Sequence, residues 1–206
     1  MGGEGPSGSL ILTGCEGGSV IAHDLRMGGP AWTLDLSTNS QLVTGGGTGV
    51  CCLSSLSSVP VYSRPSDGLV VAGCTGGFVC VINTATRSIV ATHKPHTDDV
   101  RAISVHASAS GNAGLGSGPR SSSSSFSLVT TSFDSTGAIW NVSNSPNGST
   151  SYLSFEKESV MQSHSDKILG VISTVRNGVV EVLTTGADGK AILWSQRNSS
   201  ARAKLR

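Results

Sequence analysis

One short pattern occurs four times along this chain, and that repeat restricts the possible fold more than any other feature. Each copy is an apolar run, a tight turn containing glycine or aspartate, and a second apolar run. The copies are Leu10–Asp24, Leu69–Asn83, Leu128–Trp140 and Val182–Trp194. The turn positions align 54–59 residues apart, at Gly17, Gly76, Asp134 and Asp188. This arrangement of apolar runs and turn residues predicts four β-hairpins.

Further apolar runs flank the hairpins and predict four strands in each complete unit. They precede the hairpins at 50–56, 100–106 and 168–174, and follow them at 31–36, 89–93 and 152–156. A small sheet with two apolar faces cannot bury both alone, whereas sheets stacked radially around an axis can. We therefore predict an all-β fold of β-propeller blades, each a four-stranded antiparallel sheet.

The number of predicted strands indicates an incomplete ring. The first unit lacks a run before Leu10 and the fourth lacks one after Trp194. A seven-bladed ring at about 40–45 residues per blade needs roughly 300 residues, and this chain has 206. We expect 1–206 to be one propeller segment, completed by further blades of a longer chain or by a partner. A Gly/Ser tract at 107–125 is predicted to be disordered, and the basic tail at 201–206 to be solvated.

Two units share polar residues at equivalent positions. His96-Thr-Asp-Asp-Val-Arg-Ala-Ile103 precedes Asp134 and Ile139-Trp140-Asn141, and His164-Ser-Asp-Lys-Ile168 precedes Asp188 and Leu193-Trp194-Ser195. Each aspartate lies six residues before its tryptophan. In these residues the chain resembles the WD-repeat β-propeller family, and the resemblance extends from Leu10 to Ser195.

The resemblance implies a hydrogen-bonded set of four side chains, here called a tetrad, in each of these two units. The tetrads would be His96, Thr130, Asp134 and Trp140, and His164, Thr184, Asp188 and Trp194. In the first two units Gly17 and Gly76 replace the aspartate, while His23 and Ile82 replace the tryptophan. Apolar packing without a tetrad is therefore expected in those units.

The resemblance also implies partner-binding positions on one face of the propeller. They are the third and fifth residues after the tetrad histidine and the residue before the turn aspartate: Asp99, Arg101, Phe133, Lys167, Leu169 and Ala187. Exposed aromatic residues and arginine are enriched at binding hot spots, which favours Arg101 and Phe133. Phe133 could instead pack against a neighbouring blade.

Charge and composition argue against several classes of partner. The chain has 14 basic and 13 acidic residues, so no clustered charge predicts binding to nucleic acid or to an anionic membrane. It has no run of about 18 apolar residues and no signal-peptide pattern at its start. We expect a cytoplasmic or nuclear protein, with Cys15, Cys51, Cys52, Cys74 and Cys80 as free thiols.

No residue pattern predicts an enzyme, a cofactor or a metal site. His164 and Asp188 with nearby serines suggest a hydrolase triad, but there is no Gly-x-Ser-x-Gly elbow, and the tetrad also accounts for Trp194. The cluster Thr44–Gly49 lacks the lysine of a phosphate loop and a helix to follow it. It is interpreted as a flexible turn between strands.

These observations predict a non-enzymatic scaffold or adaptor that binds other proteins. One alternative is a structural subunit of a large assembly, which an extensive apolar face at either end would favour. The other is a substrate receptor of a cullin-type ubiquitin ligase. It rests on Asp24 and Arg26, which match part of the Trp-Asp-x-Arg ending of some family members.

Overall fold

Four separate antiparallel sheets make up the described part of the protein. The computed structural model describes residues 10–56, 68–107, 125–144, 153–176, 179–195 and 200–205. The first sheet contains β1 (Leu10–Gly14), β2 (Ser19–Asp24) and β3 (Pro30–Asp35); the second contains β4 (Val50–Ser55), β5 (Leu69–Cys74), β6 (Val79–Asn83) and β7 (Ser88–His93). The third contains β8 (Val100–Ala107), β9 (Ser125–Ser132), β10 (Gly137–Asn144) and β11 (Leu153–Met161); the fourth contains β12 (Ile168–Arg176), β13 (Val179–Gly186), β14 (Ala191–Ser195) and β15 (Ser200–Leu205).

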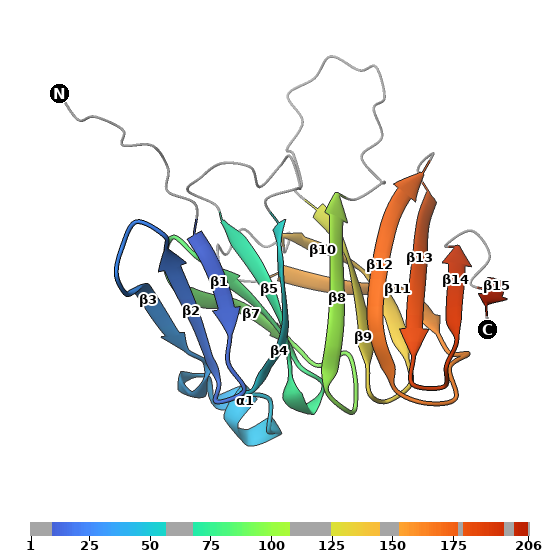
Figure 1. Ribbon diagram of the computed structural model, residues 1–206, viewed down its shortest axis with the longest axis horizontal. Helices are drawn as coiled ribbons and strands as arrows, with labels where there is room; N and C mark the ends of the chain where they lie inside the picture. Colours follow the sequence, from blue (N-terminus) through green and yellow to red (C-terminus); the bar gives the residue numbers. More distant parts are fainter. Residues whose placement is uncertain are drawn as a thin grey trace, which may run out of the picture.

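The four sheets lie side by side in chain order and do not close into a ring (Figure 1). Strand β4 contacts β8, and β8 contacts β12, so the first strands of neighbouring sheets run along a common side. The first and fourth sheets lie at opposite ends of the row (Figure 1). The prediction of an all-β fold with an incomplete ring is confirmed.

Backbone conformation supports the alignment of the four hairpins. The residue after each aligned turn position has a positive φ: Gly18 at 90°, Gly77 at 84°, Ser135 at 67° and Gly189 at 73°. Glycine adopts this conformation without a steric penalty, and short polar residues tolerate it better than branched ones. The same positive-φ position thus recurs in every unit, although only two units carry the turn aspartate.

Three apolar cores lie between successive sheets. Val20, Ala22 and Trp32 of the first sheet pack with Ala72, Cys80 and Ile82 of the second. The second and third sheets share a core that includes Val71, Val81, Phe126 and Trp140, and the third and fourth share one that includes Val129, Ile139, Val182 and Trp194. Each internal sheet therefore buries both faces, as expected for propeller blades.

The chain after Trp194 differs from the sequence prediction. Residues Ser200–Leu205 form β15 and pair with β14, from Ser195 opposite Ser200 to Ala191 opposite Leu205. The expectation of no strand after Trp194 was therefore wrong. Basic residues such as Arg202 and Lys204 are common in edge strands, where charge discourages pairing with another chain, so a basic composition did not exclude a strand.

The predicted disordered tract lies largely outside the described residues. Its end residues, Ala107 and Ser125, belong to β8 and β9, so the tract begins and ends inside paired strands. Residues 108–124 are not described.

The glycine cluster at Thr44–Gly49 overlaps the end of a short helix, which the sequence analysis did not predict. Helix α1 (Ser40–Gly45) begins after Asn39, whose side chain accepts hydrogen bonds from the N–H groups of Gln41 and Leu42. It ends at Gly46, whose φ of 71° suits a left-handed C-terminal cap. A 3-10 turn, η1 (Leu36–Thr38), precedes it. None of the described helices has the length and apolar character needed to cross a membrane.

Candidate functional site

The structure brings together the four residues of the tetrad predicted in the fourth sheet. Trp194 Nε1 lies 2.9 Å from Thr184 Oγ1, which lies 2.8 Å from His164 Nε2. His164 Nδ1 is 3.0 Å from Asp188 Oδ1. The carboxylate also accepts the backbone N–H groups of Ser165 and Lys190, both at 3.1 Å. These bonds join β13 and β14 to the loop before β12 and to the turn between β13 and β14.

The third sheet repeats this arrangement. Trp140 Nε1 lies 3.1 Å from Thr130 Oγ1, which is 2.8 Å from His96 Nε2. His96 Nδ1 is 3.2 Å from Asp134 Oδ2 and 2.9 Å from Thr136 Oγ1. Both predicted tetrads are thus hydrogen-bonded in the structure.

The chemistry of each group assigns the protons of the two networks. An indole N–H can only donate, so the threonine oxygen accepts from tryptophan and its own proton goes to histidine Nε2. Histidine Nδ1 then carries a proton and donates it to the aspartate. Burial acts to raise the pKa of Asp134, but hydrogen bonds from Thr136, Thr97 N–H and His96 outweigh it and hold that pKa below its ordinary value.

The first sheet keeps part of this network in a different form. Thr13 and His23 occupy the threonine and tryptophan positions, and Thr13 Oγ1 lies 3.1 Å from His23 Nε2. In the second sheet Ala72 and Ile82 fill the same positions and are fully buried. Apolar packing without a tetrad was expected in both sheets. The second sheet has it at these two positions, whereas the first sheet retains the polar contact between Thr13 and His23.

One buried and two half-buried histidines should make the stability of the protein depend on pH. Burial lowers the pKa of His93, His96 and His106 below the ordinary value of 6.5. At His96 the charge and hydrogen bond of Asp134 act in the opposite direction but do not outweigh burial, and nearby Lys157 adds to the lowering of the pKa at His93 and His96. The unfolded chain therefore binds more protons than the folded chain once the pH falls below about 6.5. We expect the melting temperature to be level above about pH 7 and to fall between roughly pH 6.5 and 5.

Thermal unfolding at pH 5 to 8 and constant ionic strength tests this expectation. Ordinary carboxyl groups titrate near pH 4, so this range separates the histidines from the aspartates. A melting temperature that stays constant from pH 7 to 5 would contradict it.

The predicted partner-binding residues gather at one end of β8 and β12. Phe133, in the turn after β9, is partly exposed and lies beneath two cations: Arg101 Cζ is 5.0 Å and Lys167 Nζ 4.5 Å from the ring centre. Both cations are exposed. Phe133 N–H donates to the Asp99 carbonyl at 3.0 Å, and Ala187 N–H donates to the Lys167 carbonyl at 2.8 Å, so the same backbone bond positions these loops in both sheets.

A β-bulge directs three equivalent side chains toward this end. The pairing of β4, β8 and β12 with their neighbours skips one residue each, namely Cys51, Arg101 and Leu169. Bulges commonly redirect a side chain at the rim of a sheet, and Leu169 is 52% exposed. Cys51 was not predicted as a partner-binding residue, although it follows Val50 just as Arg101 follows Val100. We call Cys51, Arg101, Phe133, Lys167 and Leu169 the rim surface.

Asp99 has a different role from the other predicted residues. Its carboxylate accepts the backbone N–H of Gly76 at 3.1 Å and so connects the third sheet to the turn of the second. Burial raises the pKa of the Cys51 thiol, and the charge of Asp99 acts in the same direction. The structure thus assigns Asp99 to the support of the rim surface.

The residues behind the alternative functions form bonds within the chain. Asp24 Oδ2 accepts from the Arg26 guanidinium at 2.6 Å, and Asp24 Oδ1 accepts from Arg26 Nε and from the Arg26 backbone N–H. These hydrogen bonds lower the pKa of Asp24 to about 2. His164 Nε2, the atom that would activate a serine in a hydrolase triad, is bonded to Thr184 instead. All five cysteines are free.

A scan of the sequence against protein-family models finds no match, and a search of curated proteins finds none either.

Proposed function

We propose that this chain is a non-enzymatic scaffold of WD-repeat type that binds other proteins through the rim surface. The observation that carries the proposal is the partly exposed Phe133 ring beneath Arg101 and Lys167. Backbone hydrogen bonds fix the loops that carry these side chains at the ends of the sheets, which reduces the ordering that a partner must impose on them. Free thiols support a reducing compartment, the cytoplasm or the nucleus.

A structural subunit of a larger assembly is the second candidate function. Leu169 and Ile172 on β12 are 52% and 64% exposed, and Leu10 and Ile11 on β1 are 43% and 47% exposed. Large apolar side chains exposed on the two terminal sheets favour permanent contact with further protein. No comparable observation favours a ubiquitin-ligase receptor, because Asp24 and Arg26 are bonded to each other.

Replacing Arg101 by alanine should remove specific partners without unfolding the protein. Arg101 is exposed, so we expect a change in stability within about 0.5 kcal/mol. A hot-spot arginine contributes about 2 kcal/mol or more to binding, roughly a thirtyfold loss of affinity. Affinity purification with wild-type and R101A chains, followed by identification of what is lost, provides the measurement. Arg176→Ala, at the opposite end of β12, is the control.

Retention of every partner by R101A and by Phe133→Ala would overturn the rim surface as the binding site. Loss of the same partners in R176A would mean that general positive charge matters, and would also count against it.

A further inference from the structure

Strand β7 differs in composition from the other outer strands. Each sheet ends in an outer strand whose second edge has no partner strand among the described residues. Three of these strands carry proline or charge: Pro30 and Asp35 in β3, Glu156, Lys157 and Glu158 in β11, and Arg202 and Lys204 in β15. Such residues discourage another chain from pairing with the edge. Strand β7, Ser-Ile-Val-Ala-Thr-His, contains neither proline nor Asp, Glu, Lys or Arg.

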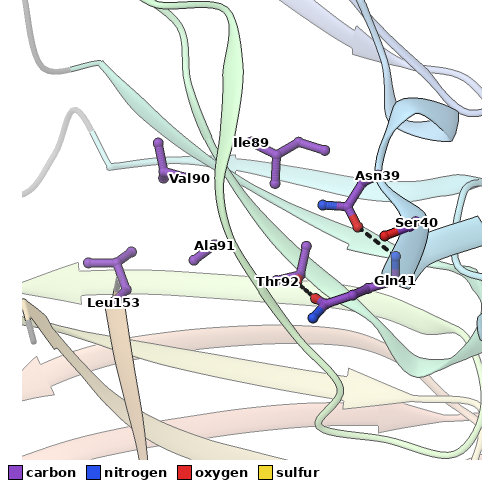
Figure 2. A pocket seen from close by; sticks show the side chains of 8 residues that line it. All are labelled: Asn39, Ser40, Gln41, Ile89, Val90, Ala91, Thr92 and Leu153. Atoms are coloured by element: carbon purple, nitrogen blue, oxygen red, sulfur yellow. Dashed lines mark hydrogen bonds between the residues drawn. The ribbon is translucent and has the colours of Figure 1, made fainter. Parts of the chain in front are cut away.

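A groove follows this unprotected edge. A hollow of about 380 Å³ is lined by the consecutive residues Ile89, Val90, Ala91 and Thr92. Successive strand residues point to opposite faces, so a hollow that touches four in a row lies along the edge of the strand. Figure 2 shows β7 between Asn39, Ser40 and Gln41 on one side and Leu153 on the other. In the described chain, the backbone of β7 pairs only with β6.

A second hollow extends the groove toward the end of the strand. It encloses about 420 Å³, shares Gln41 and Thr92 with the first, and is bounded further along by Phe78, His93 and Lys94. Thr92 Oγ1 donates to Gln41 Oε1 between the two hollows (Figure 2). Together they follow the chain from Ile89 to Lys94, about 20 Å in an extended conformation.

The groove offers backbone groups, apolar side chains and a single terminal cation. Val90, Ala91 and Leu153 provide apolar contacts, and Asn39, Ser40 and Gln41 provide hydrogen-bonding groups on the opposite wall. Lys94 Nζ lies 4.8 Å from the centre of the Phe78 ring at the far end. The Nε2 atom of His93 has no hydrogen-bond partner in the described structure.

We propose that an extended segment of another protein binds in this groove and adds to the second sheet as a fifth strand beside β7. Backbone hydrogen bonds to the free edge provide affinity, and alternate side chains provide specificity. The chemistry of the walls fits small or β-branched residues facing Val90 and Leu153, and a carboxylate near Lys94. This site is separate from the rim surface and goes beyond the proposed function.

Peptide selection tests the proposal directly. The immobilised full chain is exposed to a phage-displayed library of random 12-residue peptides, and the enriched peptides are synthesised. Ser40 is exposed and lines the groove, so Ser40→Trp should fill the groove without disturbing a core. Val43 lies on the same helix, is 52% exposed and does not line the groove, so Val43→Trp is the matched control. A second probe is the same peptide methylated at alternate backbone nitrogens.

We expect the selected peptides to bind the wild type and V43W equally and S40W at least tenfold more weakly. Backbone methylation should abolish binding, because it removes the donors that pair with a strand edge while it leaves the side chains intact. Binding should also slow amide hydrogen exchange in β7. Arg101→Ala should leave this binding unchanged, which distinguishes it from binding at the rim surface.

Three outcomes would overturn the proposal. The selection could yield no binding peptide, the peptides could bind S40W as well as the wild type, or the methylated peptides could still bind. Peptides lost with R101A but retained by S40W would support the rim surface and reject the β7 groove.

Discussion

Replacement of Thr184 by valine should lower the free energy of unfolding by about 2–4 kcal/mol. The valine side chain has nearly the same shape, but it cannot accept from Trp194 Nε1 or donate to His164 Nε2. Thr184 is fully buried, so no water replaces the lost hydroxyl. Each buried polar group left without a partner costs about 1–3 kcal/mol, and the added methyl group recovers part of that loss.

Thermal or urea unfolding of the purified chain measures the effect. For a chain of this size, 1 kcal/mol corresponds to about 2–4 °C in melting temperature, so a decrease of roughly 4–16 °C is expected. Thr185→Val is the matched control, because Thr185 is the next residue of β13 and is exposed. Its effect should stay within about 0.5 kcal/mol. Equal melting temperatures for T184V and the wild type would contradict the role assigned to the tetrad.

The hairpins and tetrads could be predicted from the sequence because both depend on short-range patterns. A hairpin needs an apolar run, a turn and another apolar run within a few residues. In a tetrad, the six-residue interval from Asp134 to Trp140 fixes which face of the hairpin each side chain occupies. By resemblance, Arg101 and Leu169 were each placed as the fifth residue after a tetrad histidine, and the structure has a bulge at both positions.

Features that depend on packing between distant segments were missed. Strand β15 was missed for a different reason: it alternates polar and apolar residues, but its basic side chains were interpreted as a solvated tail, and its pairing with β14 identifies it as a strand. Helix α1 has six residues, too few for a periodic pattern to predict. Its neighbour Gly47 leaves space for the Phe78 ring, since a Cβ atom there would lie 2.4 Å from a ring carbon. The β7 groove combines α1, β7 and Leu153, and no local sequence pattern predicts that combination.

The rim surface was predicted in part. Arg101, Phe133, Lys167 and Leu169 were placed by resemblance, and the structure brings Arg101 and Lys167 to the Phe133 ring. The hydrogen bond from the Gly76 N–H to the Asp99 carboxylate could not be predicted, because it depends on how closely the turn of the second sheet approaches the start of β8. Contacts between sheets, more than contacts within a hairpin, therefore limit what the sequence predicts.

The outward face of the fourth sheet should cause the isolated chain to self-associate. Ile172, Leu183 and Leu193 lie opposite one another across β12, β13 and β14 and form an apolar row. Their neighbours Val182, Ile192 and Trp194 face the third sheet and are buried, whereas Ile172 is 64% exposed. Contiguous apolar surface of this kind favours association. We expect assemblies larger than the 20.9 kDa monomer at micromolar concentration.

Ile172→Lys should weaken this association about tenfold to a hundredfold. Burial of an isoleucine side chain contributes about 1.5–3 kcal/mol, and each 1.4 kcal/mol corresponds to tenfold in affinity. Size-exclusion chromatography with light scattering over a series of concentrations gives the molecular mass. Leu25→Lys is the control, because Leu25 is 74% exposed in the turn between β2 and β3, away from the apolar row. A wild-type chain that remains monomeric at high concentration, or an I172K chain that associates like the wild type, would exclude this face as the contact. The expected result, dissociation by I172K but not by L25K, would show that the outward face of the fourth sheet drives assembly.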